Sequence, residues 1–284
     1  MYNTLQLGIK YINFLLTANN GRGHGMHSPF VYDLIRNVLM DKTYHEAYKK
    51  PEEYRKKLLN DDSVLEIEDM GAGSVSGTTK KRTVSEIAKT SVKHKRYSQL
   101  LYRLASYYKY GRILELGTSL GVTSSYLAQV PVLEELVTME GADAVADIAE
   151  GELSKYGKVR VVRGNFDQQV AGGRLQVAVS GEQEAVSRTN LEKVVSDMPR
   201  IDLAFVDGNH RKEPTLRYFE TIFPKTHEGS CIIFDDIHWS AEMEEAWEKI
   251  RKDERVKLSI DLFFIGIVFF RTEFREKQHF SIRY

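Results

Sequence analysis

The sequence has one cysteine, no net charge and no long apolar run, and each absence narrows the possible functions. Cys231 has no second cysteine to pair with, which favours a reducing compartment and predicts a cytoplasmic protein. The 40 basic and 40 acidic side chains cancel, so no net field attracts nucleic acid or an anionic membrane. The apolar stretch 262–270 is much shorter than the ~18 residues that span a bilayer. Neither nucleic acid nor a membrane is therefore expected as a partner.

What is present after residue 110 is the pattern of an α/β domain. Short apolar runs alternate with stretches of helical period, which predicts consecutive βα units around a parallel sheet. Seven strands are expected, at 112–116, 133–139, 159–162, 201–206, 230–234, 256–261 and 264–270. Helices are expected to begin near Gly121, Asp143, Gln183, Glu213 and Ser240. The predicted fold is a doubly wound, Rossmann-like, mostly parallel sheet.

Two further features complete the predicted architecture. No helix fits between the last two strands, so they should form an antiparallel hairpin that turns near Leu262 and Phe263. Residues 1–110 contain helical patterns and no convincing strand, which predicts an N-terminal helical cap over the domain at 111–284. One helical face in this cap is apolar and contains Leu5, Ile9, Ile12 and Leu16.

The cap also contains segments whose role the sequence leaves open. A charged helix is expected at 44–59, between glycine-rich stretches at 19–28 and 70–77. The basic run at 80–96 is either a solvated helix face or a site for a phosphate or an acidic partner. His24 and His27 lie in the first glycine-rich stretch, from which they could enter a site.

A strand followed by a glycine turn marks the candidate ligand site. The sequence Ile113-Leu-Glu-Leu-Gly-Thr-Ser-Leu-Gly121 leads an apolar strand through two glycines into a helix, whose first N–H groups can bind a carboxylate. Glu115, inside the strand, is placed to receive the ammonium group of an amino-acid-bearing ligand. Glu140 ends the next strand, where its carboxylate can accept both hydroxyls of a ribose. A tight turn without a ligand is the plainer alternative.

Two other interpretations of glycine turns are less favoured. A nicotinamide-dependent dehydrogenase would need G-x-G-x-x-G, but its second and third glycines are replaced by Ser119 and Val122. Residues 66–73 also place glycines after an acid, but polar residues rather than an apolar helix follow them. We interpret that second turn as a loop, with its glycines as candidate hinges of a lid.

The E-x-G-x-(S/G)-x-G turn and the strand-terminal acid resemble class I S-adenosylmethionine-dependent methyltransferases, over about 170 residues that include the final hairpin. The resemblance implies that Gly117 and Ser119 face the methionine moiety, Glu140 the ribose and Asn165 the adenine. Asp is more usual than Asn at this last position. The full set of implied cofactor-binding residues is Glu115, Gly117, Thr118, Ser119, Gly121, Glu140, Asn165 and Asp207.

A cluster of acids is expected beside that site. Asp207 follows the fourth predicted strand, and Asp235 and Asp236 follow the fifth, so three carboxylates should converge and suit Mg²⁺ or Mn²⁺. Alternatively, these aspartates only cap helices. The pattern resembles metal-dependent, catechol-type O-methyltransferases, which carry a catalytic lysine three residues after the first aspartate. His210 stands there in this chain, and a histidine can accept a proton at neutral pH.

These patterns predict an S-adenosylmethionine-dependent enzyme that methylates a small molecule, at oxygen and with a divalent metal ion. Asp207 and His210 are its candidate catalytic residues, and His238 and Trp239 are candidates for the substrate pocket. No two prolines are adjacent, so the Pro-Pro-Tyr turn of many N-methyltransferases is absent. A noncatalytic protein that binds the same cofactor remains the alternative. The sequence identifies neither the methyl acceptor nor the oligomeric state, for which a homodimer is one option.

Overall fold

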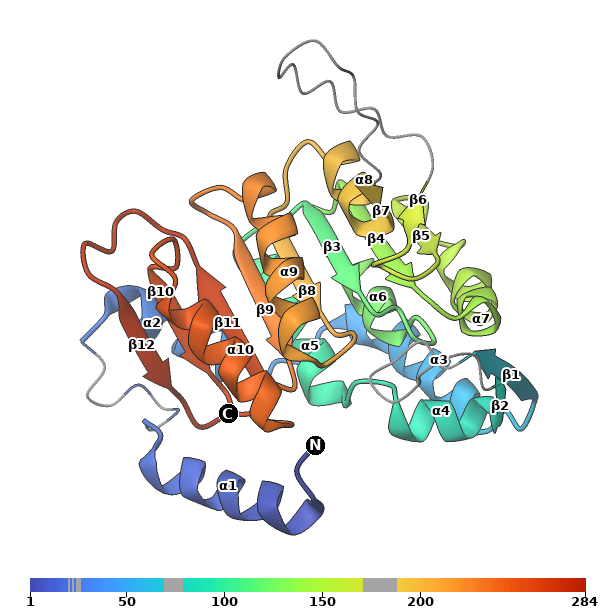
Figure 1. Ribbon diagram of the computed structural model, residues 1–284, viewed down its shortest axis with the longest axis horizontal. Coiled ribbons are helices and arrows are strands. Elements are labelled where there is room, and N and C mark those ends of the chain that lie inside the picture. The colour runs from blue at the N-terminus through green and yellow to red at the C-terminus, as the bar shows by residue number, and fades with distance from the viewer. Residues whose placement is uncertain (20, 22, 24–26, 69–78, 171–187) are drawn as a thin grey trace.

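The central element of the protein is an eight-stranded sheet. The computed structural model describes residues 1–19, 21, 23, 27–68, 79–170 and 188–284 (Figure 1). The strand order is β12-β10-β11-β9-β8-β3-β4-β5. Five neighbouring strands are parallel, namely β3 (Arg112–Leu116), β4 (Glu135–Glu140), β5 (Val159–Arg163), β8 (Leu203–Val206) and β9 (Cys231–Asp235). The order reverses direction between β3 and β8, and such a switch point is where open α/β sheets bind ligands.

The antiparallel end of the sheet confirms the predicted hairpin. Strand β11 (Ile265–Phe269) runs antiparallel to both β9 and β10 (Leu258–Asp261). The chain turns at Leu262 and Phe263, where Phe263 has a positive φ of 72°. All seven predicted strands are present, and an eighth, β12 (Gln278–Ser281), pairs in parallel with β10. The sequence pattern missed β12 because this short edge strand is half polar and only partly buried.

Helices cover both faces of the sheet, so both faces are buried. Alternate residues of each strand point to opposite faces and belong to different cores. Ile113, Phe205 and Ile233 belong to one core, which includes residues of α2 (Pro29–Leu34), α5 (Lys95–Tyr107), α6 (Val122–Leu127) and α7 (Asp143–Leu153). Leu114, Ala204 and Ile232 belong to the other core, under α8 (Asn190–Asp197), α9 (Lys212–Ile222) and α10 (Ala241–Lys252). The sheet is therefore doubly wound, as predicted.

Four of the five predicted helix starts lie within one residue of the observed ones, at α6, α7, α9 and α10. Ser240 caps α10 by accepting a hydrogen bond from the Met243 N–H. The fifth predicted start, Gln183, lies outside the described residues, and α8 begins at Asn190 with a capping box between Thr189 and Glu192. Just before it, β6 (Gln169–Val170) pairs with β7 (Arg188–Thr189).

The N-terminal 110 residues are largely helical, as predicted, but they also contain a β-hairpin that the sequence analysis missed. The hairpin pairs β1 (Val64–Glu68) with β2 (Thr79–Thr83) in antiparallel register. β1 falls partly within the second glycine turn, 66–73, whose remaining residues lie outside the described part of the chain. The prediction of no strand here was wrong because β2, with the sequence Thr-Lys-Lys-Arg-Thr, carries no apolar residue to mark it.

The helices of this segment other than α1 share the core of the sheet. The segment contains α1 (Thr4–Thr17), α2 with the π-helical η1 (Ile35–Leu39), the 3-10 turn η2 (Glu46–Tyr48), α3 (Lys49–Leu59), α4 (Val84–Thr90) and α5. Buried residues of α2, α3, α4 and α5 belong to the same core as Ile113 of β3. The Tyr54 hydroxyl donates a hydrogen bond of 2.8 Å to the Leu120 carbonyl, which joins α3 to the glycine turn after β3. None of the described helices is long and apolar enough to cross a membrane.

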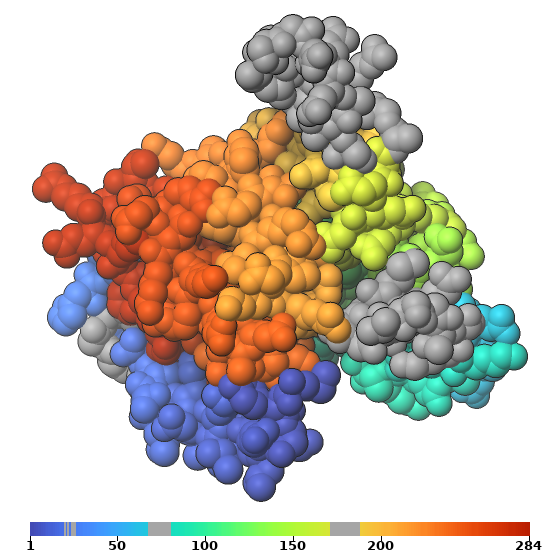
Figure 2. Space-filling view, viewed as in Figure 1, coloured from blue at the N-terminus to red at the C-terminus, as the bar shows by residue number. Residues whose placement is uncertain are grey.

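Helix α1 differs from the other helices in how it packs. Its predicted apolar face is turned outward, with Leu5 and Leu16 73% and 75% exposed. The helix contacts the protein through its other side, where Tyr11 and Phe14 pack on Phe263. Figure 2 shows α1, in dark blue, as a ridge at the edge of the molecule next to the orange C-terminal helix.

Candidate functional site

A cavity of about 1020 Å³ opens at the carboxyl ends of β3, β4, β8 and β9. Its wall combines the loops that follow these strands with residues of the N-terminal segment, among them Arg82, Lys93 and Tyr97. The cavity therefore lies at the switch point of the sheet and is closed on one side by the segment that the sequence predicts as a cap.

The glycine turn brings the backbone of β3 close to that of β8. Gly117 has a φ of +100°, and a Cβ atom there would lie 2.0 Å from the Asp207 carbonyl oxygen. Only glycine fits such a close approach of the two backbones at a positive φ. Gly121, with a φ of +79°, is the N-cap of α6. The turn is thus determined by local backbone geometry.

Glu140 lies at the end of β4 and its carboxylate holds the same turn. The Ser119 N–H donates to Oε2 at 2.8 Å, and the Ala142 N–H donates to Oε1 at 3.0 Å. Each carboxylate oxygen can accept a second hydrogen bond, so both remain capable of binding ribose hydroxyls. Burial raises the pKa of Glu140. Gly117, Ser119, Glu140 and Asn165 all line the cavity, as the prediction of a cofactor site requires.

Glu115, by contrast, lies behind the turn and does not line the cavity. Its side chain is 0% exposed and accepts hydrogen bonds from Ser124 and, at 2.7 Å, from the Thr138 hydroxyl. Burial raises its pKa to about 7. Thr118 is also buried and shares a hydrogen bond with Thr138. The expected contact between Glu115 and a ligand's ammonium is not available in this arrangement, because the strand turns this side chain into the interior.

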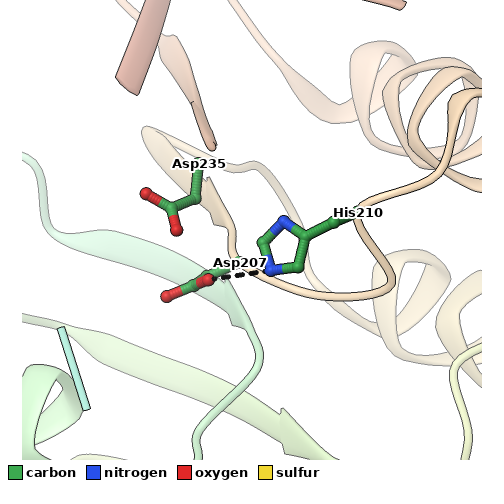
Figure 3. Close-up of side chains that lie close together, drawn as sticks. All are labelled: Asp207, His210 and Asp235. Atoms are coloured by element: carbon green, nitrogen blue, oxygen red, sulfur yellow. Dashed lines mark ion pairs between the residues drawn. The ribbon is translucent and has the colours of Figure 1, made fainter. Parts of the chain in front are cut away.

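The acids after β8 and β9 come together with the predicted base (Figure 3). Asp207, His210 and Asp235 each present one potential ligand atom, and these atoms lie within 4.8 Å of one another. The His210 Nε2 is 3.5 Å from Asp207 Oδ1. Asp236 also lines the cavity, with a positive φ of 52°, but it is not one of this group of three.

Burial has opposite effects on the acids and on the histidine. It raises the pKa of Asp207 well above its usual range, with a further contribution from the charge of Asp235. Burial and the same neighbouring charge raise the pKa of Asp236 to about 7. Burial lowers the pKa of His210, which favours its neutral imidazole. A neutral imidazole next to the cavity can accept a proton.

The sequence analysis missed Lys93 as a member of this cluster. Its ammonium contacts Asp235 Oδ2 and lies 3.8 Å from Asp207 Oδ2. The charges of Asp207 and Asp235 raise the pKa of Lys93 despite its burial, so the ammonium stays protonated. Lys93 belongs to the basic run at 80–96, and no spacing in the sequence distinguishes it from the other lysines of that run.

Other candidate residues have different positions. Trp239 lines the cavity, but His238 does not: it stacks on Phe263 and is hydrogen-bonded to Asp261 and Glu244. His27 is exposed and does not line the cavity, and His24 lies outside the described residues.

Comparison with known proteins extends these observations. Residues 114–237 match the model of a family described as "Methyltransferase domain". This match covers β3 to β9 and so includes both the glycine turn and the cluster of acids. No curated protein matches the chain.

Several solved structures share the fold. An SAH-bound methyltransferase from Podospora anserina has a TM-score of 0.52 and 12% identity, over 95% of this chain and 97% of that chain. A proposed O-methyltransferase from Klebsiella pneumoniae has a TM-score of 0.50 and 15% identity, over 83% and 94%. A proposed caffeoyl-CoA O-methyltransferase from Staphylococcus aureus has a TM-score of 0.51 and 16% identity, over 65% and 88%. The predicted fold class is thereby confirmed.

Proposed function

We propose that the chain, whose residues 114–237 match a methyltransferase domain, is a class I S-adenosylmethionine-dependent methyltransferase that methylates an oxygen atom of a small molecule bound in the cavity. The observation that carries the proposal is the position of His210. A neutral histidine lines the same cavity as Gly117 and Glu140, so a proton acceptor and a nucleoside site share one space. The zero net charge of the chain favours a small molecule over a nucleic acid as the acceptor.

The residues around the glycine turn fit the cofactor. Bound S-adenosylmethionine supplies a methyl group on a positively charged sulfur. Gly117 and Ser119 line the cavity beside the turn, and the Glu140 carboxylate is held by two backbone N–H groups at the cavity wall. Glu140 would accept the ribose hydroxyls, and Asn165, which lines the same cavity, would contact the adenine. An enclosed site of this kind orients the two reactants and so lowers the entropic barrier to transfer.

His210 would take the proton of the acceptor hydroxyl. An oxygen nucleophile must lose its proton as the new bond forms, and a positioned base typically contributes about 10²- to 10⁴-fold to the rate. Burial keeps the imidazole neutral near pH 7, and the Asp207 carboxyl lies beside its Nε2. Nitrogen acceptors of comparable size would use the same base, but a hydroxyl has the greater need of it.

The predicted divalent ion is less well matched to the site. Two carboxylates and an imidazole are suitable donors for Mg²⁺ or Mn²⁺. Their carboxylates, however, already surround the Lys93 ammonium, which occupies the place where their oxygens converge. The residues as placed therefore do not fit the ion, and no step of the proposed reaction depends on it.

The test compares binding and turnover in His210→Ala. We expect calorimetry to give wild-type affinity for S-adenosylmethionine, while product formation on a panel of hydroxylated small molecules falls by about 10²- to 10⁴-fold. His27→Ala is the matched control, because His27 is exposed and outside the cavity. Cofactor binding by the wild type without turnover of any acceptor would instead support the noncatalytic alternative. Undiminished turnover in His210→Ala would remove His210 from the reaction.

A further inference from the structure

We propose that the Lys93 ammonium takes the place of a divalent ion at the Asp207–Asp235 cluster and makes methyl transfer by this protein independent of metal. This inference rests on the proposed function, since it assigns a role at the same site. It concerns the cation that neutralises the two carboxylates and faces the acceptor oxygen.

The backbone on either side of Lys93 is well fixed. Helix α4 ends at Thr90, and the N–H of its C-cap, Ser91, donates to the Ile87 carbonyl at 2.8 Å. Helix α5 begins with His94 as its N-cap, and the His94 ring accepts a hydrogen bond from the Arg96 N–H. Only two residues separate these two caps, so the short link between the helices fixes the position of the Lys93 backbone. The position is thus a product of the fold and not of a long surface loop.

The side chain of Lys93 extends from this link into the acids. Its ammonium contacts Asp235 Oδ2 and is 3.8 Å from Asp207 Oδ2. The Lys93 side chain is 15% exposed, and that of Asp235 is 1% exposed. The second oxygen of Asp235 is buried and has no hydrogen-bond partner among the described residues. The negative charge of Asp235 therefore depends on Lys93 for its compensation.

A divalent ion and this ammonium would compete for one location. The ligand atoms that would bind an ion come from Asp207, His210 and Asp235, all within 4.8 Å of one another. Lys93 already uses an oxygen from each of the two aspartates. A divalent ion at this location would have to share these two carboxylate oxygens with the ammonium, and the two positive charges would repel each other. The cluster therefore holds one cation at a time, and in this structure that cation is the Lys93 ammonium.

The Lys93 ammonium can stabilise negative charge on the acceptor oxygen, as a divalent ion would. A cation beside a hydroxyl lowers the hydroxyl's pKa and stabilises the negative charge that develops on oxygen. Lys93 has three N–H donors, and the structure uses one of them on Asp235. In the transfer, the acceptor oxygen gives its proton to His210 and bonds to the methyl carbon. The carbon–sulfur bond breaks with its electron pair left on sulfur, and Lys93 keeps its own proton throughout.

Metal binding tests this proposal without any knowledge of the acceptor. Mn²⁺ titrations followed by electron paramagnetic resonance should show no site in the wild type that depends on Asp235. Lys93→Ala should gain one Mn²⁺ site, because it exposes two uncompensated carboxylates, and adding Asp235→Asn should remove that site again. Lys95→Ala is the control, since Lys95 is two residues away and exposed. S-adenosylmethionine binding by each variant checks that it is folded.

Two results of the titration would overturn the proposal. An Mn²⁺ site in the wild type that is lost in Asp235→Asn would show that an ion displaces the ammonium. No gain of Mn²⁺ binding in folded Lys93→Ala would show that the carboxylates do not converge on a cation. A purely structural role for Lys93 would leave Mn²⁺ binding unchanged in all variants.

Turnover provides a second test, on any acceptor that the wild type methylates. Wild-type turnover should be unaffected by a chelator, and Lys93→Met, which keeps most of the side-chain length, should lower kcat roughly a hundredfold. Added Mg²⁺ should restore part of the activity of Lys93→Ala and none to the wild type. Loss of wild-type turnover in chelator would overturn the metal-independent mechanism. If no acceptor is methylated, the proposed function fails, while the Mn²⁺ titration still decides the role of Lys93.

Discussion

The cavity has two halves that are built in different ways. The half that we propose for the cofactor, here called the cofactor half, has Gly117, Ser119 and Glu140; it comes from the stretch of chain from the end of β3 to the end of β4 and is held by backbone N–H groups. The half that we propose for the acceptor, here called the acceptor half, combines the loops after β8 and β9 with Lys93, which lies more than one hundred residues earlier in the sequence. It is held by the ion pairs of the Lys93 ammonium with Asp207 and Asp235. Local backbone geometry thus determines the first half, and tertiary packing determines the second.

Because of this difference, the two halves should be sensitive to different kinds of substitution. In the cofactor half, the turn does not tolerate a side chain at Gly117, because its Cβ atom would collide with the Asp207 carbonyl oxygen. The charged cluster instead depends on the balance among its members, since burial and the charge of Asp235 raise the pKa of Asp207 and of Asp236 while the charge of Lys93 lowers it. The three predictions that follow examine the cofactor half, beginning with the largest expected effect.

Glu115 should make the stability of the cofactor half depend on pH, because it is buried where it does not contact the cavity. Burial raises its pKa from 4.5 to about 7 in the folded protein. The folded chain therefore binds more protons than the unfolded chain in this window, and the free energy of unfolding falls as the pH rises through it. The difference of about 2.5 pKa units corresponds to about 3 kcal/mol.

We expect Glu115→Gln to remove this pH dependence, since a neutral amide does not titrate. Urea denaturation of the cofactor-free protein across the pH 4.5 to 7 window measures the effect. Glu135→Gln, on the neighbouring strand β4, is the control for a general change in charge. Equal slopes in the wild type and Glu115→Gln would mean that burial does not raise the pKa of Glu115 in the folded state.

The two halves also differ in how much of them the sequence could predict. The glycine turn was predicted from its strand-to-helix pattern, and Glu140 from the position of an acid about 20 residues later, at the end of the next strand. The convergence of Asp207 with Asp235 followed from the rule that parallel strands end at the same edge. Lys93 could not be found in this way, because the path from α4 to α5 places it and nothing marks it within a basic run. Similarly, the strand pattern predicted seven of the eight strands of the large sheet but neither β12 nor β2, in which most residues are polar.

Glu140→Ala tests the cofactor half directly. Removing the carboxylate should weaken the binding of S-adenosylmethionine by about 1.5 to 3 kcal/mol, or roughly ten- to hundredfold, because charged hydrogen bonds to the ribose are lost. Calorimetry measures this affinity. Glu135→Ala is a matched control, since Glu135 begins the same strand at the opposite end from the cavity.

The same variant also removes the acceptor of the Ser119 and Ala142 N–H groups. Thermal denaturation without cofactor therefore has to be measured alongside, to separate loosening of the turn from loss of ribose contacts. Unchanged affinity in a stable Glu140→Ala protein would place the ribose elsewhere and contradict the assignment of this half.

The smallest expected change in the free energy of unfolding concerns a hydrogen bond from the N-terminal segment to the glycine turn of the cofactor half. Tyr54 belongs to the N-terminal segment, yet its buried hydroxyl donates to the Leu120 carbonyl of the glycine turn. Tyr54→Phe removes this hydrogen bond and leaves the carbonyl unpaired at a buried position, at a cost of about 1 kcal/mol in the free energy of unfolding. Tyr44→Phe is the control, because Tyr44 is 66% exposed. If Tyr54→Phe also lowers the affinity for S-adenosylmethionine more than tenfold in calorimetry, the turn is not determined by its own backbone alone. The N-terminal segment would then position both halves of the cavity.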